Sequence, residues 1–281
     1  MLNLLTKRIP KAHRIFYRVL PFIALLILVK LVLHRLNLEL LSINAIFSGL
    51  IGANVFLMGF LLSGVLSDYK ESERLPGDMA ASLATLADEM QSIHQRTCAP
   101  VALAALEHVH TLGVTIHQWL HKRERSRAVM ALISGLNGHF LAVEPHTQAN
   151  FIARLKQEQS ALRRIIIRIH TIRETDFISS GYFIARTTTF FLLLGLVAAR
   201  IEPFYESLFF LVVVSYLLLF LLFLIGDLDN PFGYYENESS EDVSLKPLED
   251  ALADLRARLL EDSERAPLPP STSVPSSRDP R

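Results

Sequence analysis

The stretch SINAIFSGLIGANVFLMGFLLSGVLSD, residues 42–68, decides the fold of this chain. It carries no formal charge before Asp68, and a run of that length predicts a helix that crosses a bilayer. At helical spacing, small, hydroxylated and aromatic residues share one side of this helix, namely Ser48, Gly52, Phe56, Phe60, Ser63 and Ser67. Such a side either packs against another helix or lines a wet cavity, and this stretch alone favours packing.

The composition of the chain indicates a membrane protein with a large water-exposed part. Hydrophobic residues make up 51% of its 281 positions and charged residues 20%, which is too apolar for an ordinary soluble domain. Basic and acidic residues both number 28, so we predict no nucleic-acid partner. Cys98 is the only cysteine, which excludes an intrachain disulfide and a zinc site built from cysteines.

Three further apolar runs predict membrane helices at about residues 16–33, 178–199 and 208–226. We expect Lys30, near the end of the first run, to snorkel to the membrane interface. Arg186 lies within the third predicted helix. Its side chain either faces a partner or water, or snorkels to the nearby cytoplasmic end.

The region between the second and third membrane helices is polar and has helical periodicity. We expect the central helix to end in the polar run SDYKESERLPGD, residues 67–78. Apolar residues at three- and four-residue spacing then predict helices over residues 79–95, 101–125 and 151–173. Pro100 and Pro145 mark expected helix boundaries.

Basic residues predict the orientation of the chain. The first eighteen residues and the region 68–177 are rich in Lys and Arg, whereas the turn 200–206 holds Arg200 with two glutamates. The positive-inside rule therefore places both termini and the large helical region in the cytoplasm, and we expect a multi-pass protein of the bacterial inner membrane.

These observations divide the chain into an N-terminal cytoplasmic segment, the first two membrane helices, a cytoplasmic helical region, the last two membrane helices, a cytoplasmic turn with a C-terminal helix, and a tail. The predicted ranges are 1–15, 16–67, 68–177, 178–226, 227–265 and 266–281. The C-terminal helix carries a leucine stripe that should pack against the soluble bundle or a neighbouring subunit, formed by Leu248, Leu252, Leu255 and Leu259. The tail is rich in Pro and Ser and is expected to be disordered.

No sequence motif indicates an enzyme. His117 and His121 share a helical face at a spacing that can hold zinc, but no carboxylate lies between them as in a metalloprotease. Ordinary surface or subunit contacts explain these histidines better. A glycine-rich phosphate loop and a nucleophile elbow are both missing from the sequence. We predict a protein that is not an enzyme and that has no metal or cofactor.

The segment after the fourth membrane helix has two interpretations. Its oxygen-bearing side chains flank a tight turn, at Asp227, Asp229, Asn230, Glu236 and Glu238. Converging carboxylates and carbonyls are what a hard cation such as calcium needs. The alternative is a helix stop that is followed by a solvated acidic segment.

In the order of these features the sequence resembles the bestrophin family of pentameric ion channels, and more closely its bacterial and plant-type members. The family's layout is two hydrophobic helices, a long cytoplasmic helical insert, two more hydrophobic helices and an Asn-Pro-Phe-Gly turn, which lies here at residues 230–233. The family-like stretch EDVSLKPL follows at residues 241–248. The charged exit of the family's second helix is similar to Asp68, Tyr69, Glu71 and Arg74. The resemblance covers about residues 10–260.

The resemblance implies an all-α membrane fold in a homopentamer whose second helices line the pore. It makes Phe56 and Phe60 the candidates for a hydrophobic neck that gates by dewetting. Gly52, Ser63 and Ser67, with Ser48, would line the wider ends. One departure argues against calcium activation, because two tyrosines stand where animal members carry a dense acidic run after the turn, Tyr234 and Tyr235.

The resulting hypothesis is a channel for the passive transport of small monovalent ions. An anion such as chloride is favoured, and a cation is the alternative, since the family resemblance implies both kinds of member. The expected partners are further copies of the chain, membrane lipids and the ions. The rival hypothesis is a non-conducting membrane scaffold that recruits a partner through its cytoplasmic helices.

Overall fold

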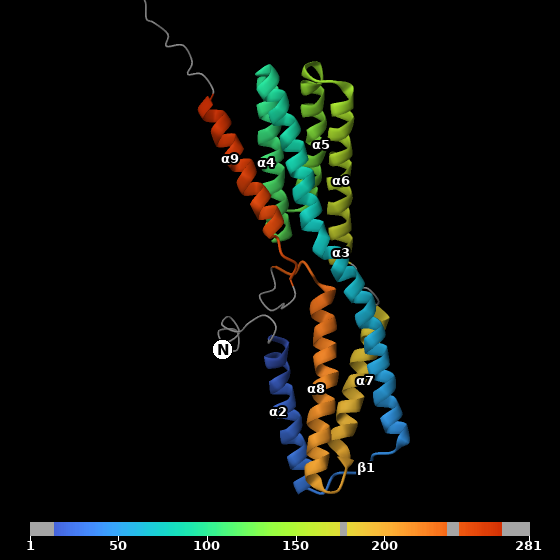
Figure 1. Ribbon diagram of the computed structural model, residues 1–281. Coiled ribbons are helices and arrows are strands. Elements are labelled where there is room, and N and C mark those ends of the chain that lie inside the picture. The colour runs from blue at the N-terminus through green and yellow to red at the C-terminus, as the bar shows by residue number, and fades with distance from the viewer. Residues whose placement is uncertain (1–13, 175–178, 235–241, 266–281) are drawn as a thin grey trace, which may run out of the picture.

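The computed structural model describes residues 14–174, 179–234 and 242–265 (Figure 1). The described helices are α2 (Arg14–Arg35), α3 (Ala45–Thr97), α4 (Pro100–Leu120), α5 (Ser126–Val143), the short 3₁₀ helix η3 (Glu144–His146), α6 (Ala149–Glu174), α7 (Ser179–Ala198), α8 (Phe204–Asp229) and α9 (Lys246–Arg265). Two-residue strands β1 (Leu41–Ser42) and β2 (Ala199–Arg200) pair in parallel. The expectation of an all-α fold is confirmed.

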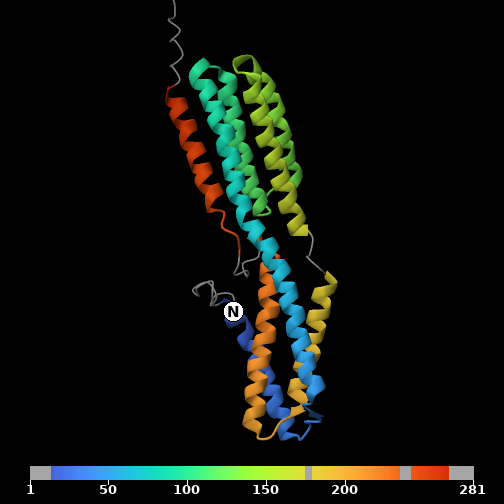
Figure 2. The same ribbon diagram turned by 45° about the vertical axis from the view of Figure 1, so that its right-hand side comes forward.

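The helices form two layers. In Figures 1 and 2, α2, α7, α8 and the first half of α3 make one bundle, while α4, α5, α6, α9 and the second half of α3 make the other. Among the described residues, α2, α3, α7 and α8 are long and apolar enough to cross a membrane. The protein is therefore an integral, multi-pass membrane protein with a second, polar helical layer.

Helix α3 runs through both layers without a break. It begins where the Asn44 side chain accepts a hydrogen bond of 2.9 Å from the backbone N–H of Phe47. The expected stop between residues 67 and 78 is wrong, because α3 is helical through Pro76 to Thr97. The middle of that polar run holds good helix formers, from Lys70 to Leu75, and Pro76 is itself buried.

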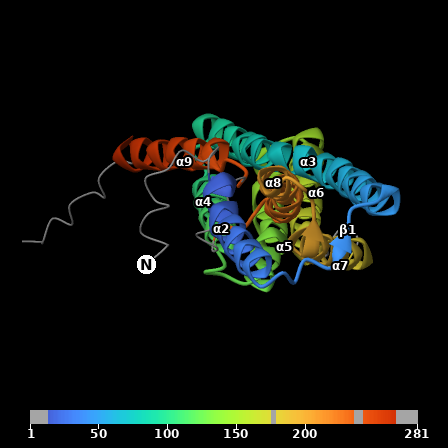
Figure 3. The same cartoon turned by 90° about the horizontal axis from the view of Figure 1, so that it is seen from below.

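One side of α3 packs against the membrane layer. Met58, Leu61 and Val65 are buried in a cluster with residues of α7 and α8. Asn54 is buried on the same side, and its Nδ2 donates a hydrogen bond of 3.0 Å to Thr189 Oγ1 of α7. In the view of Figure 3, α3 lies along one edge of the molecule, with α2, α7 and α8 all on one side of it. Among the described residues, no helix covers the opposite side of the half of α3 that lies in the membrane layer (Figure 3).

The end of the membrane layer that holds β1 and β2 is closed by a buried ion pair. Lys30 Nζ lies 2.7 Å from Glu39 Oε1 and also donates a hydrogen bond to the carbonyl of Ala199. The Lys30 side chain is 0% exposed, so the expectation that it snorkels to the interface is wrong. An ammonium that finds a carboxylate and a carbonyl within the protein no longer needs the interface.

The polar layer has its own core, built from α3, α4, α5, α6 and α9. The sequence predicted α4 and α6, but not α5, and it extended α4 past Leu120, where Lys122 in fact has a left-handed φ of 55°. The leucine stripe of α9 packs against α3 and α4, with Leu248 and Leu255 buried, which confirms the expected contact with the soluble bundle.

Candidate ion pathway

The neck residues predicted from the sequence lie on the side of α3 that no described helix of the protomer covers. Phe56 is 79% exposed and Phe60 is 60% exposed. Met58, only two residues from either phenylalanine, is fully buried against α7 and α8. The remaining predicted lining residues share the exposed side, namely Ser48, Gly52, Ser63 and Ser67. The exposed side is thus a continuous stripe, which we call the α3 stripe.

The composition of the α3 stripe is not that of a plain lipid-facing surface. It alternates hydroxyl groups, a glycine and two aromatic rings over about five helical turns. A Cβ added at Gly52 would meet no atom within 4 Å, and the same holds at the neighbouring Gly59. The fold of one protomer therefore does not require glycine at either position.

Charged residues follow the α3 stripe where α3 leaves the membrane layer. Arg168 of α6 donates hydrogen bonds of 2.8 and 2.5 Å to the two carboxylate oxygens of Glu71, and its guanidinium lies 3.4 Å from Asp68 Oδ1. The hydrogen bonds to Glu71 raise the pKa of Arg168 above its ordinary value. We call Arg168 with its two carboxylate partners the Arg168 clamp. It links α6 of the polar layer to the part of α3 that leaves the membrane layer. Sequence reasoning missed it, because the partners are 97 residues apart.

The predicted cation-binding turn is only partly within the described residues. Asp227 is buried at the end of α8, and its Oδ1 lies 2.8 Å from Arg18 Nη1 of α2. Glu236 and Glu238 lie outside the described residues. In the described part of the chain, no group of three His, Cys, Asp or Glu side chains is placed to hold a metal ion. The site at Asp227, Asp229 and Asn230 stays a prediction, with one carboxylate already engaged by an arginine.

The Asn-Pro-Phe-Gly turn joins the two layers. Phe232 is fully buried in the core of the polar layer, next to α9. The hydroxyl of Tyr234 donates a hydrogen bond of 2.7 Å to the carbonyl of Val243, and burial raises the pKa of Tyr234. Val243 N–H in turn donates to the carbonyl of Pro231. The described part of the turn therefore acts as a structural joint.

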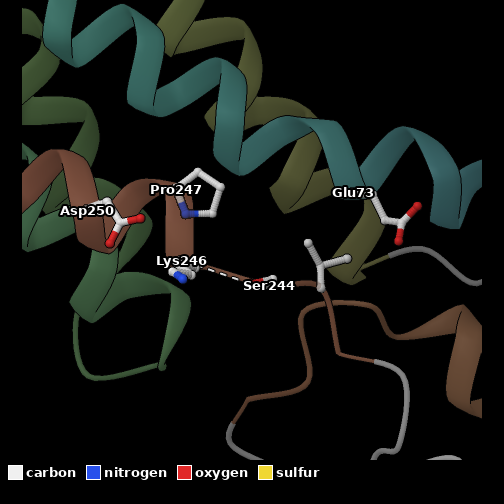
Figure 4. Close-up of a pocket in the computed structure, with 6 residues that line it drawn as sticks. Glu73, Ser244, Lys246, Pro247 and Asp250 are labelled. Atoms are coloured by element: carbon white, nitrogen blue, oxygen red, sulfur yellow. Dashed lines mark hydrogen bonds between the residues drawn. The ribbon is translucent and has the colours of Figure 1, made fainter.

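A hollow of about 460 Å³ opens beside this joint, between α3 and the start of α9 (Figure 4). It is lined by Glu73, Val243, Ser244, Lys246, Pro247 and Asp250. Figure 4 shows the carboxylates of Glu73 and Asp250 at opposite ends of the hollow, not directed at one point. The lining does not converge on a single ligand atom.

The remaining candidate residues are dispersed. The rings of His117 and His121 lie 4.6 Å apart, and His117 Nε2 is 3.5 Å from Glu249 Oε1 of α9. His121 directs its Nδ1 at the carbonyl of His117, 2.9 Å away. Arg186 is exposed on α7. These histidines serve contacts between helices, and the two alternatives for Arg186, a polar partner or snorkelling, stay predictions.

No protein-family model and no curated protein sequence matches the chain. Solved structures do match. A bacterial bestrophin homologue from Klebsiella pneumoniae aligns with a TM-score of 0.69 at 16% sequence identity, covering 90% of this chain and 100% of that chain. A single-residue variant of that homologue aligns with a TM-score of 0.68 at 17% identity, covering 88% and 98%. A structure described as a membrane protein aligns with a TM-score of 0.69 at 17% identity, covering 90% and 99%. The resemblance stated from the sequence is thus confirmed at the level of the fold.

Proposed function

We propose that this protein, which has the fold of the bacterial bestrophin homologues, is a homopentameric channel for the passive transport of small monovalent ions. The single observation that carries the proposal is the α3 stripe. It is exposed in the protomer, carries small and hydroxylated residues around Phe56 and Phe60, and faces away from every other membrane helix.

An assembly of five copies of the chain would explain the composition of the α3 stripe. Ringed about one axis, the α3 helices would turn Phe56 and Phe60 inward as two stacked aromatic constrictions, with Gly52 and Ser63 lining the wider parts. A hydrophobic ring of this kind resists water until it widens, which is gating by dewetting. The resemblance to the bestrophin family implies the same arrangement.

The orientation and the location follow the distribution of charge. We place the polar layer and both termini in the cytoplasm, because the basic residues cluster there and the α7–α8 connection has only Arg200 against Glu202 and Glu206. The membrane would be the inner membrane of a bacterium. The ion would be an anion such as chloride, and a small cation is the alternative.

Ion flux into liposomes tests the proposal. Purified protein should carry flux above that of empty liposomes, and replacing both Phe56 and Phe60 by Ala should raise it several-fold, because the constriction widens. A matched control is Phe183→Ala, which removes an exposed aromatic ring from α7, outside the α3 stripe. It should leave the flux unchanged.

The second candidate is a membrane scaffold that conducts no ions and recruits a partner through its cytoplasmic helices. Such a partner would contact the outer surface of the polar layer, where Leu141 of α5 is exposed. This protein would give no flux either as wild type or as the double alanine variant. That result would contradict the channel.

A further inference from the structure

The α3 stripe does not end with the membrane layer. Because α3 is helical without interruption from Ala45 to Thr97, the direction of each later side chain follows from the helical repeat. Eighteen residues, or about five turns, separate Phe56 from Arg74, so both side chains leave the helix in the same direction. Lys70 lies two turns beyond Ser63 and also follows the stripe. Both basic residues are exposed.

Neither basic residue is in an ion pair within the described part of the chain, although the charge of Arg74 acts on the neighbouring carboxylate of Glu71. In that part of the chain, Lys70 and Arg74 form no salt bridge and donate no side-chain hydrogen bond. The acidic side chains next to Lys70 and Arg74 are placed against other groups. Asp68 and Glu71 share Arg168 of α6, and Glu73 turns toward the hollow beside α9.

The order of charges along the stripe is therefore defined. An ion that leaves the hydrophobic constriction passes Lys70, then Glu71, whose carboxylate is bonded to Arg168, and then Arg74. One turn deeper, past Pro76, it meets the exposed Asp78. In a ring of subunits each of these residues would appear once per copy. Rings of Lys or Arg are typical of pores that favour anions. Their potential acts over about one Debye length, roughly 8–10 Å at physiological salt, which is about one to two helical turns.

We propose that Lys70 and Arg74 form a basic ring at the cytoplasmic exit of the neck and determine a preference for small anions. This inference rests on the proposed channel function and names its ion class. It assigns selectivity to residues outside the membrane layer, since the membrane part of the stripe carries no charge. The Arg168 clamp is a positioning element, because it holds the competing carboxylates of Asp68 and Glu71 at α6.

The reversal potential in planar bilayers under a sodium chloride gradient tests the inference. We expect Lys70→Gln combined with Arg74→Gln to lower the chloride-to-sodium permeability ratio at least about threefold. Arg74→Glu changes the charge by the same two units per subunit and should lower the ratio by a similar factor. Arg74→Lys keeps the charge and should keep the ratio. The matched control is Arg127→Gln, which should leave the ratio unchanged. Arg127 is exposed at the start of α5, a helix that packs against α4 and α6.

The outcomes separate the inference from the function on which it rests. Current with an unchanged permeability ratio in the double variant would overturn the basic ring and leave the channel intact. If the double variant carries no current, the permeability ratio is measured in the single variants Lys70→Gln and Arg74→Gln, each of which removes one exposed charge. An unchanged ratio in both would likewise overturn the basic ring. No current from the wild-type protein would overturn the channel itself, and the basic ring with it.

Discussion

Lys30 and Glu39 form an ion pair inside the protein, at the end of the membrane layer opposite the polar helices. Lys30 Nζ lies 2.7 Å from Glu39 Oε1, while His34 Nδ1 lies 3.0 Å from the second carboxylate oxygen. Lys30 also bonds the carbonyl of Ala199, next to the β1–β2 pair. One carboxylate thus links α2 to the loop that begins α3, and the ammonium links α2 to β2. This end of α3 is held by charge.

Removing the carboxylate should destabilise the protein strongly. Glu39→Gln would leave the ammonium of Lys30 buried without a counter-charge, which costs roughly 3–5 kcal/mol. Thermal unfolding in detergent, followed by the loss of the folded peak in size-exclusion chromatography, measures the effect. The control is Arg35→Gln, which removes an exposed charge from the same helix end and should change little. A loss below about 1 kcal/mol for Glu39→Gln would mean that water already solvates the pair.

The same carboxylate predicts a pH dependence. Burial alone would raise the pKa of Glu39, but hydrogen bonds with His34 and Lys30 and their charges outweigh it, so the pKa lies below its ordinary value of 4.5. A carboxyl group whose pKa is lowered by folding stabilises the fold above pH 4.5, and this contribution is lost as the pH falls through the lowered pKa.

The unfolding temperatures of the wild type and Glu39→Gln should therefore differ by a constant amount near neutral pH and converge at acid pH. Repeating the comparison in a His34→Gln background keeps the carboxylate and removes one of its hydrogen-bond partners. A difference between wild type and Glu39→Gln that persists in full at acid pH, in either background, would contradict a stabilising role of the charged carboxylate.

Gly195 on α7 should not tolerate a side chain. A Cβ at this position would lie 2.6 Å from Phe47 Cε2 and 3.1 Å from Phe47 Cζ, on the first turn of α3. The ring would have to move, so we expect Gly195→Ala to cost about 1–3 kcal/mol in spite of the better helix propensity of Ala. Gly226→Ala on α8 is the matched control, because no atom lies within 4 Å of the added Cβ. Equal unfolding temperatures for the two variants would show that the contact between α3 and α7 is loose.

The leucine stripe of α9 should be necessary for its docking on the polar layer. Leu255 is 1% exposed, whereas Leu260 on the same helix is 57% exposed. Leu255→Ala should cost about 2–5 kcal/mol of docking energy, and Leu260→Ala should stay within about 0.5 kcal/mol. Limited proteolysis of the full chain measures this, because release of α9 exposes the segment around Val243 to cleavage. Equal cleavage rates for both variants would contradict the role of Leu255.

Hydropathy and helical spacing were enough to predict the four membrane helices and which residues share one side of α3. By themselves they favoured packing of that side against another helix, whereas the structure leaves it exposed in the protomer. The helices and the shared side both depend on local pattern: a run of apolar residues has one stable form in lipid, and residues three and four apart share a face. The prediction that α3 stops between residues 67 and 78 failed for a related reason. Pro76 and the charged residues before it have the local pattern of a helix end, but both layers pack on α3 and keep it helical.

The contacts between distant segments could not be predicted. Arg168 and Glu71 are 97 residues apart, and Arg18 and Asp227 are 209 apart. In the sequence, Arg168 is one of several basic residues next to a predicted membrane helix, where the positive-inside rule already explains it. Only the packing of α6 beside α3 brings that guanidinium to Glu71. For Lys30, the local sequence is the same whether the side chain snorkels to the interface or pairs with a carboxylate inside the protein. The two cases differ only in whether the fold brings a carboxylate within reach.

The number of subunits is the prediction on which the ion pathway depends most directly. The α3 stripe leaves Phe56 and Phe60 exposed, and a ring of five chains about a shared axis would bury both from lipid. Native mass spectrometry of detergent-purified protein should therefore give five times the 31.7 kDa mass of the chain. Cross-linking adds a residue-level readout. A cysteine placed at Ser63 should link neighbouring subunits through the stripe, whereas one at exposed Phe183 on α7 should not, with Cys98 replaced by Ser in both proteins. A monomeric protein, or cross-linking at Phe183 in place of Ser63, would show that the stripe faces lipid and that α3 lines no pore.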